Sequence, residues 1–245
     1  MKFSRIAAAG PSAAAALLIA ACGTADAATP HTASLPGDGH SHATLQVLTG
    51  TAVLRVGVAK LGTDGPLLRV STPAGDPAPQ LREPAGHPVA VLSAPGASAV
   101  TVTLNTAVSW QLDLGGGTTR TVADLRGARL TGINVTAGSD VLDLLLPRPA
   151  GDVPVRMAGG ASQFLLSLPR GIQARVTAAG GAGEVSVLGR DYVGVAGGSV
   201  FTTPGWTAGA AGFDIDATAG AARVAVTARH FRLARPAGQA ARTAP

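Results

Sequence analysis

Residues 138–169 read GSDVLDLLLPRPAGDVPVRMAGGASQFLLSLP, and this stretch carries the pattern that decides the fold. Gly138 and Gly160 each stand nine residues before a proline, Pro147 and Pro169. Between each glycine and its proline, apolar residues alternate with polar ones or form short runs, as in β-strands bounded by turns. The stretch therefore predicts two copies of one strand-containing unit.

The same unit recurs along the chain. Turn glycines separated by 21, 21, 21, 22 and 21 residues stand at Gly75, Gly96, Gly117, Gly138, Gly160 and Gly181. Gly50 and Gly220 lie outside this regular run. A fixed period of about 21 residues is typical of stacked β-architectures with about two strands per unit. We predict an all-β, β-solenoid-like or folded-sheet domain over residues 43–230, and spacing alone leaves a two-sheet sandwich open as the alternative.

The composition excludes several other classes of protein. The 245 residues include 33 Gly, 17 Pro and one Cys, with 46% hydrophobic and 13% charged residues. A single cysteine excludes a disulfide framework and a Cys-rich zinc site. The chain is too apolar and too weakly charged for a disordered protein, and its glycine and proline content disfavours a helical bundle.

The first 21 residues indicate export from the cell. Lys2 and Arg5 precede a short apolar run that Gly10 and Pro11 interrupt, so this segment predicts a signal peptide and not a membrane-spanning helix. An ordinary signal peptide that is cleaved after Ala25-Asp26-Ala27 is one way to process it.

A lipid anchor is the processing that we favour. The signal ends in Ile19, Ala20, Ala21 and Cys22, which resembles the lipobox of bacterial lipoproteins, and Cys22 is the only cysteine of the chain. The resemblance implies a diacylglyceryl group on its sulfur, with fatty acids such as palmitate, and several acyl chains anchor a protein stably. We therefore expect a lipoprotein at the extracytoplasmic face of the cell membrane.

Residues 22–42 are rich in small, polar and turn-forming residues and predict a flexible tether. His31, His40 and His42 lie within it and could hold a transition metal weakly. A third and fourth ligand at fixed spacing are lacking, so we predict no metal site and no cofactor.

Residues 231–245 form a basic tail. The formal net charge is +5, and five arginines follow the last acidic residue, Asp216: Arg223, Arg229, Arg232, Arg235 and Arg242. Such a tail suits anionic lipid or wall polymer better than nucleic acid, and a solvated, frayed end is the alternative.

Aromatic residues gather near the C-terminus, where the period breaks in a Gly-rich stretch over residues 189–212. A stack of repeats needs a cap over its open core, and we expect these rings to supply it. The functional alternative is a binding patch for a ligand or partner around Trp206, Tyr192 and Phe213.

Residues 121–227 resemble the β-repeat domain of bacterial envelope proteins named "putative adhesin", which is related to the C-terminal toastrack domain of the cell-wall-stress regulator LiaF. The matching pieces are Asp124–Gly127, Leu144–Pro149, Gly159–Ser162, Gly180–Gly183, Thr203–Trp206 and Phe213–Asp216. The resemblance implies a β-repeat domain at the cell envelope without known catalysis, and it assigns no catalytic residue.

The search for catalytic groups finds no carboxylates at a shared offset from the turn glycines, and no nucleophile elbow. Asp214 and Asp216 flank Ile215, and we interpret them as a solvated strand face with Ile215 pointing inward. We predict a non-enzymatic, lipid-anchored envelope protein that binds cell-wall polymer or an envelope protein. A secreted carbohydrate-active enzyme on a β-helix scaffold is the alternative, and it would need carboxylates that face each other across a groove.

Overall fold

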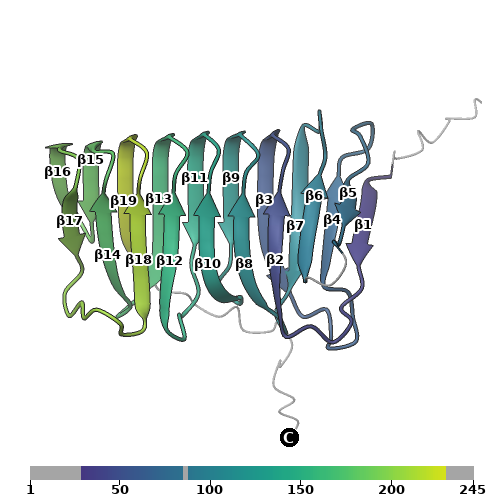
Figure 1. Ribbon diagram of the computed structural model, residues 1–245. Coiled ribbons are helices and arrows are strands. Elements are labelled where there is room, and N and C mark those ends of the chain that lie inside the picture. Colours follow the sequence, from purple (N-terminus) through teal and green to yellow (C-terminus); the bar gives the residue numbers. More distant parts are fainter. Residues whose placement is uncertain (1–28, 85–87, 230–245) are drawn as a thin grey trace, which may run out of the picture.

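The computed structural model describes residues 29–84 and 88–229, and all regular structure in these ranges is β-strand (Figure 1). Ile19, Ala20, Ala21 and Cys22 lie outside the described residues, as does the predicted tail 231–245. Within the described ranges, no helix could cross a membrane. The predicted all-β repetitive fold is confirmed.

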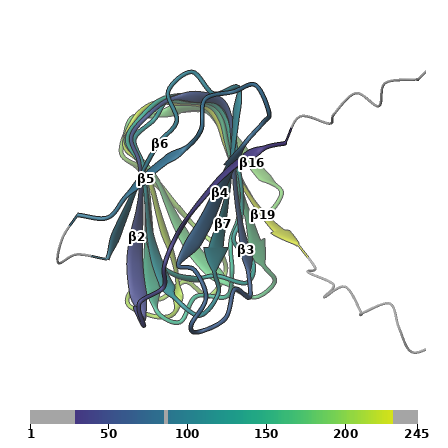
Figure 2. The ribbon, with the colours of Figure 1, turned by 90° about the vertical axis from the view of Figure 1, so that its right-hand side faces the viewer.

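The strands form two sheets. Sheet A contains, in spatial order, β1 (His31–Leu35), β4 (Leu68–Thr72), β7 (Ala99–Asn105), β3 (Thr51–Ala59), β9 (Thr118–Asp124), β11 (Ser139–Leu145), β13 (Ala161–Pro169), β19 (Ala221–Arg229), β15 (Ala182–Val187) and β16 (Arg190–Val195). Sheet B contains β17 (Ser199–Thr202), β14 (Gln173–Ala178), β18 (Gly212–Ala217), β12 (Asp152–Met157), β10 (Arg129–Val135), β8 (Ser109–Leu114), β2 (His42–Val47), β6 (Val89–Ser93) and β5 (Gln80–Arg82). Figure 2, a view along the stack, shows the sheets as two walls that face each other.

The repeating unit, which we call a rung, is one strand of sheet B followed by a glycine-containing turn and one strand of sheet A. Neighbouring rungs pair in parallel, with Ser139 of β11 opposite Thr118 of β9 on one side and Ala161 of β13 on the other. A sandwich of antiparallel hairpins would not give this pairing, so the stack is solenoid-like. Antiparallel pairs occur only at the two ends of the described sheets, through β1, β4, β5, β16 and β17.

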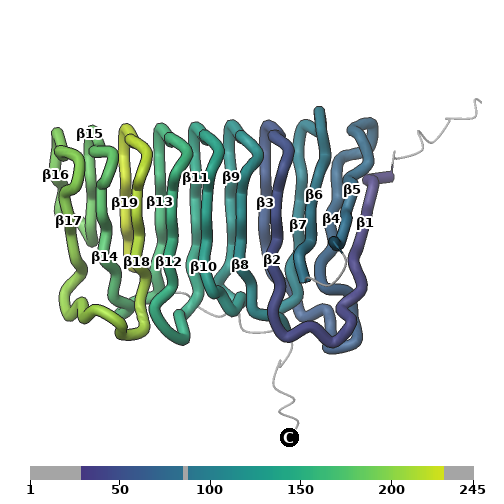
Figure 3. Tube along the Cα trace, in the orientation of Figure 1, coloured from purple at the N-terminus to yellow at the C-terminus, as the bar shows by residue number. Residues whose placement is uncertain are grey.

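The order of the rungs in space differs from their order in the sequence at both ends of the stack. The β2–β3 rung lies between β6–β7 and β8–β9, and the β18–β19 rung lies between β12–β13 and β14–β15. Figure 3 shows the second of these as the yellow pair of strands flanked by green ones. Each end of the stack is therefore held together by segments that are distant in the sequence.

The core lies between the two sheets and is built by alternation. In β8 every second side chain is buried, and those side chains are Trp110, Leu112 and Leu114. Phe164 and Phe213 are fully buried in the same core. The Trp110 indole Nε1–H donates a hydrogen bond to the Asn105 carbonyl oxygen at 3.0 Å, so this large ring is buried without losing its polar partner.

Some positions in the rung turns require glycine because the backbones of neighbouring turns nearly touch there. A Cβ atom on Gly159 would lie 2.2 Å from the Ala137 carbonyl oxygen of the next rung. The spacing that predicted the repeat is correct for Gly96, Gly117, Gly138, Gly160 and Gly181. Gly75 is corrected, because it lies in the connection from β4 to β5. Gly50 and Gly220, which stand outside the regular spacing, occupy equivalent turns beside Gly117 and Gly180.

The folded domain begins earlier than the predicted boundary at residue 43. His31–Leu35, which we assigned to the tether over residues 22–42, form strand β1 and pair antiparallel with β4. The segment is short and polar, which hides the strand in the sequence. It is an edge strand with an exposed outer face, so it needs few apolar residues.

Candidate functional site

The C-terminal end of the stack carries the predicted aromatic patch. Strands β16 and β17 are the last strands of sheets A and B, and they pair antiparallel with β15 and β14. Leu188 and Gly189 form the tight turn between β15 and β16, and both have positive φ. The chain then passes through β17 and a loop over residues 203–211 before it returns into the stack as β18.

Tyr192 and Phe201 extend the core at this end. Tyr192 lies opposite the buried Val185, and Phe201 lies opposite the buried Val176, so both rings point to the inner side of the sheets. Their ring centroids are 4.5 Å apart with an interplanar angle of 40°. The pair spans the gap between the two edge strands and covers the last rung, as a cap requires.

Trp206 is held by hydrogen bonds of its own loop. Its backbone N–H donates to the Thr203 carbonyl oxygen at 3.2 Å, and the Thr203 hydroxyl accepts from the Ala174 N–H at 2.8 Å. The Arg175 guanidinium lies 5.9 Å from the ring centroid, within the range of a cation–π contact. The ring is close to Gly212, where a Cβ atom would come within 3.2 Å of it.

Tyr192 and Trp206 line one pocket of about 640 Å³. Arg190, Thr202 and Phe201 line it as well, so it combines aromatic faces with a cation and a hydroxyl. Phe213, the third residue of the predicted patch, has no exposed surface and belongs to the core. Its placement on a surface patch is wrong, because Phe213 pairs with Val153 and Ala174 on the inward side of sheet B.

Exposed apolar side chains concentrate around this pocket. Val193 is 84% exposed, Val200 is 55% exposed, and Leu188 and Tyr192 are each 40% exposed. Among the described residues, Leu48 is the one other large apolar side chain that is exposed. Exposed apolar surface of this kind marks sites of interaction with ligands or partners.

Arg175 connects the pocket to a charged cluster on the outer face of sheet B. Its Nε and Nη2 donate to the two carboxylate oxygens of Asp214 at 2.9 Å and 2.5 Å. These hydrogen bonds raise the pKa of the Arg175 guanidinium, so it stays charged beside Trp206. Arg156 Nε lies 3.8 Å from Asp216 Oδ2.

These ion pairs bear on the enzyme alternative. A glycosidase needs two carboxyl groups that face each other across the substrate. Asp214 and Asp216 instead lie side by side on one strand, each next to an arginine, and Ile215 between them is fully buried. Ile215 points inward as predicted, whereas the face is only partly solvated, because the Oδ1 atom of Asp216 is buried without a hydrogen-bond partner among the described residues.

Two histidines of the predicted tether have polar neighbours of their own. His40 Nε2 lies 3.5 Å from Glu83 Oε1, and His42 Nδ1 lies 3.2 Å from the Ser41 hydroxyl oxygen. In residues 29–84 and 88–229, no group of three or more His, Cys, Asp or Glu side chains is placed to hold a metal ion.

Phe201 of the four-residue strand β17 is one of the C-terminal aromatic rings that we expected at this end, but sequence reasoning missed Arg175. Arg175 reaches Trp206 because β14 lies at the end of the stack beside β17. That position follows from the insertion of β18–β19, and the sequence carries no signal for it.

One solved structure shares this architecture. It is described as a "putative cell adhesion protein" from Clostridium sporogenes, and it matches 82% of this chain and 99% of its own chain, with a TM-score of 0.60 and 18% sequence identity. No protein-family model and no curated protein matches this sequence. At 18% identity the likeness shows the fold alone, and that fold is the stacked two-sheet β-domain.

Proposed function

We propose that this chain is a non-catalytic binding protein of the bacterial cell envelope, held at the outer face of the membrane by lipid on Cys22. It binds a cell-wall polymer through the pocket of Tyr192 and Trp206. The main observation behind this proposal is the position of the two ends of the domain. The described chain enters at one end of the stack, through β1, while the pocket lies at the other end, beside β16 (Figure 1).

This geometry suits display away from a membrane. Strands β1 and β16 are the two edges of the ten-stranded sheet A. Nine strand spacings of about 4.8 Å put them about 43 Å apart. Residues 23–30 between Cys22 and β1 span at most about 28 Å when fully extended. An anchor at Cys22 therefore keeps the first rungs near the bilayer, and the stack acts as a spacer that holds the pocket out in the wall.

The pocket has the chemistry of a site for a polymer of sugars. The flat faces of Tyr192 and Trp206 suit the apolar faces of sugar rings, while Arg190 and Thr202 supply hydrogen-bond donors. Binding sites combine such apolar walls with a few polar groups that fix orientation. The adhesion-related description of the Clostridium protein is in keeping with a role at the cell surface.

An envelope protein is the second class of partner. Strand β16 is an open edge of sheet A, and Val193 on it is 84% exposed. A partner that adds a strand there would gain backbone hydrogen bonds and cover this side chain.

The test is sedimentation of the full chain, made soluble by Cys22→Ala, with insoluble bacterial cell-wall material. Trp206→Ala should weaken binding by tenfold or more, because truncating a central aromatic residue typically removes a large share of the binding energy. Leu48→Ala is the matched control, since Leu48 is an exposed apolar residue in the turn between β2 and β3. It should bind like the parent chain.

If Trp206→Ala binds the wall as the parent does, the pocket is not the binding site. Loss of binding in Val193→Arg but not in Trp206→Ala would favour the strand edge and a protein partner.

A further inference from the structure

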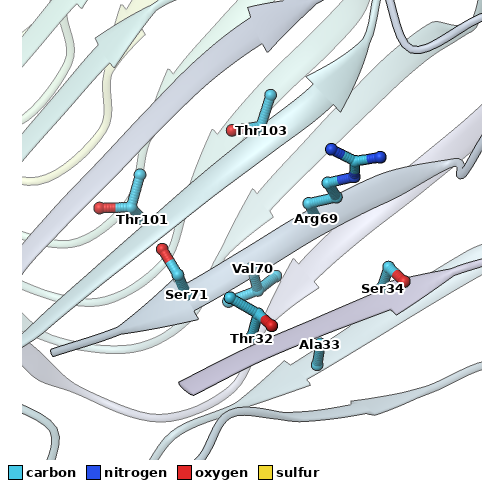
Figure 4. Close-up of a pocket in the computed structure, with 8 residues that line it drawn as sticks. All are labelled: Thr32, Ala33, Ser34, Arg69, Val70, Ser71, Thr101 and Thr103. Atoms are coloured by element: carbon cyan, nitrogen blue, oxygen red, sulfur yellow. The ribbon is translucent and has the colours of Figure 1, made fainter. Parts of the chain in front are cut away.

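The opposite end of the stack carries a second concave surface, on the outer face of sheet A. It has a volume of about 430 Å³ and is formed by the three strands β1, β4 and β7. The residues that line it are Thr32, Ala33, Ser34, Arg69, Val70, Ser71, Thr101 and Thr103 (Figure 4). Five of these eight carry a hydroxyl group, one carries a guanidinium, and none carries a carboxylate.

The strand register places these hydroxyl groups in two rows. One row runs across the strands from Thr32 through Ser71 to Thr101. The other runs from Ser34 through Arg69 to Thr103. In Figure 4, Arg69, Ser71, Thr101 and Thr103 rise from the same side of the strands. We call the six residues of the two rows the hydroxyl–arginine patch.

A second cation extends the patch on the next strand. Arg55 of β3 lies opposite Thr101, and Gly57 lies opposite Thr103. Arg55 is exposed, and nothing lies within 4 Å of the position that a Cβ on Gly57 would take. Arg55 therefore extends one row of the patch, and Gly57, with open space above it, extends the other.

The side chains of the patch have no partners among the described residues. None of the six, nor Arg55, forms a side-chain hydrogen bond or ion pair with residues 29–84 or 88–229. Arg223 of the same sheet, by contrast, pairs with Glu184, and Arg126 in the turn after β9 pairs with Asp124. One cation and five hydroxyl groups thus line the hollow, and Arg55 borders it, with their hydrogen-bonding capacity free.

The dimensions of the patch limit the size of the ligand that it can bind. Neighbouring strands are about 4.8 Å apart, and side chains two residues apart on one face are separated by about 7 Å. Two rows over three strands cover roughly 10 Å by 7 Å, which is larger than a bare phosphate and similar to a phosphate with a three-carbon polyol. The lining contains no aromatic ring on which a nucleotide base could stack.

We propose that the hydroxyl–arginine patch binds a glycerol phosphate group. Arg69 and Arg55 hold the phosphate by charge-assisted hydrogen bonds, and the serine and threonine hydroxyls bind the polyol. Two envelope components carry this chemistry, the headgroup of phosphatidylglycerol and polymers of polyol phosphate. The location of the patch near the membrane rests on the proposed function, because β1 follows the predicted anchor. The chemistry of the patch does not depend on that function.

The first test uses the full chain with Cys22→Ala and sn-glycerol 3-phosphate, with binding measured by titration calorimetry. Arg69→Gln should weaken the affinity about tenfold, which corresponds to the loss of one charged hydrogen-bonded contact. Arg129→Gln is the matched control, because Arg129 is exposed on sheet B and its removal changes the net charge equally. It should leave the affinity unchanged.

A second variant tests the site without removing any patch residue. Gly57→Asp places a carboxylate beside Thr103 in open space, so the sheet should fold normally and glycerol 3-phosphate binding should be lost. Circular dichroism and the melting temperature check that each variant is folded.

Vesicles then separate the two sources. Phosphatidylglycerol vesicles, with phosphatidylcholine vesicles as the reference, represent the headgroup, and soluble poly(glycerol phosphate) represents the wall polymer. Whichever of the two binds more tightly and loses affinity in Arg69→Gln identifies the source. Equal weakening by Arg69→Gln and Arg129→Gln would mean that net charge alone drives binding, and it would overturn the patch. This test does not involve Trp206, so its failure leaves the wall-binding pocket untouched.

Discussion

The Thr51 backbone N–H donates a hydrogen bond to the Gly117 carbonyl oxygen at 3.1 Å, and the Thr51 hydroxyl donates to the Ala97 carbonyl oxygen at 2.8 Å. Gly117 belongs to the β8–β9 rung, and Ala97 belongs to the β6–β7 rung. Thr51 therefore joins the turns of the two rungs between which its own β2–β3 rung lies. This residue is buried, so its contacts are shielded from water.

Thr51→Val should lower the free energy of unfolding by about 1–3 kcal/mol, because it removes the hydroxyl and leaves the Ala97 carbonyl oxygen buried without that donor. Thr51→Ser keeps the hydroxyl and should recover most of the loss. Urea denaturation of the three proteins measures both effects. Equal stability of Thr51→Val and the parent would show that this hydrogen bond does not hold the inserted rung.

Gly159→Ala should destabilise the fold by about 2–3 kcal/mol or more, since its Cβ would meet the backbone of the neighbouring turn at Ala137 and Gly138. Gly151→Ala serves as the control, because nothing lies within 4 Å of its Cβ position and its φ is not positive. Denaturant unfolding should separate the two variants clearly. Comparable losses in both would contradict the close approach of the turns.

The periodic part of the fold can be predicted from the sequence because it is a local property. Each rung repeats the same alternation and the same glycine-containing turn, so the spacing of Gly138 and Gly160 reveals the repeat directly. The order of the rungs is not local. The position of β18–β19 beside β12–β13 depends on side-chain packing between distant segments, and its strands alternate like any others. The polar edge strand β1 cannot be predicted for a different reason, because its apolar–polar alternation is weak.

Phe213→Ala should cost about 3–5 kcal/mol of stability, as expected for a fully buried phenylalanine. Tyr192→Ala should cost far less, because 40% of Tyr192 is exposed and its ring lies at the open end of the core. Thermal unfolding of the two variants checks this order. A small loss for Phe213→Ala would contradict its place in the core.

The aromatic patch shows where sequence reasoning about a site stops. Trp206 follows Pro204-Gly205, turn-forming residues that are typical of a loop, and it lies in the loop over residues 203–211. Phe213 and Tyr192 both lie in strands, and their neighbours in sequence do not tell which one faces a closed core and which one faces an open end. The difference arises because β18 is interior to sheet B whereas β16 is the edge of sheet A.

Acid should weaken the N-terminal end of the stack through Asp76. The Ser98 hydroxyl and backbone N–H donate to Asp76 Oδ2 at 2.6 Å and 2.7 Å and lower the pKa of this carboxyl below its ordinary value of 3.8. A lowered pKa in the folded state stabilises the protein above the ordinary value, and this stabilisation is lost as the pH falls through the folded-state pKa.

Asp76→Asn should therefore melt at a lower temperature than the parent near neutral pH, and the difference should shrink as the pH falls below 3.8 and through the lowered folded-state pKa of Asp76. Melting curves between these limits provide the measurement. A difference that does not change with pH would contradict the role of the charged carboxylate.

The anchor at Cys22 is the central claim, because it determines which end of the stack faces the membrane. The most direct measurement is the intact mass and membrane partitioning of the processed protein from bacterial cells, compared with Cys22→Ala. The account predicts a chain that begins at Cys22, carries the added mass of a diacylglyceryl group and stays with the membrane, and a variant that is released. A soluble product that begins near Ala28, and is the same in both proteins, would contradict it.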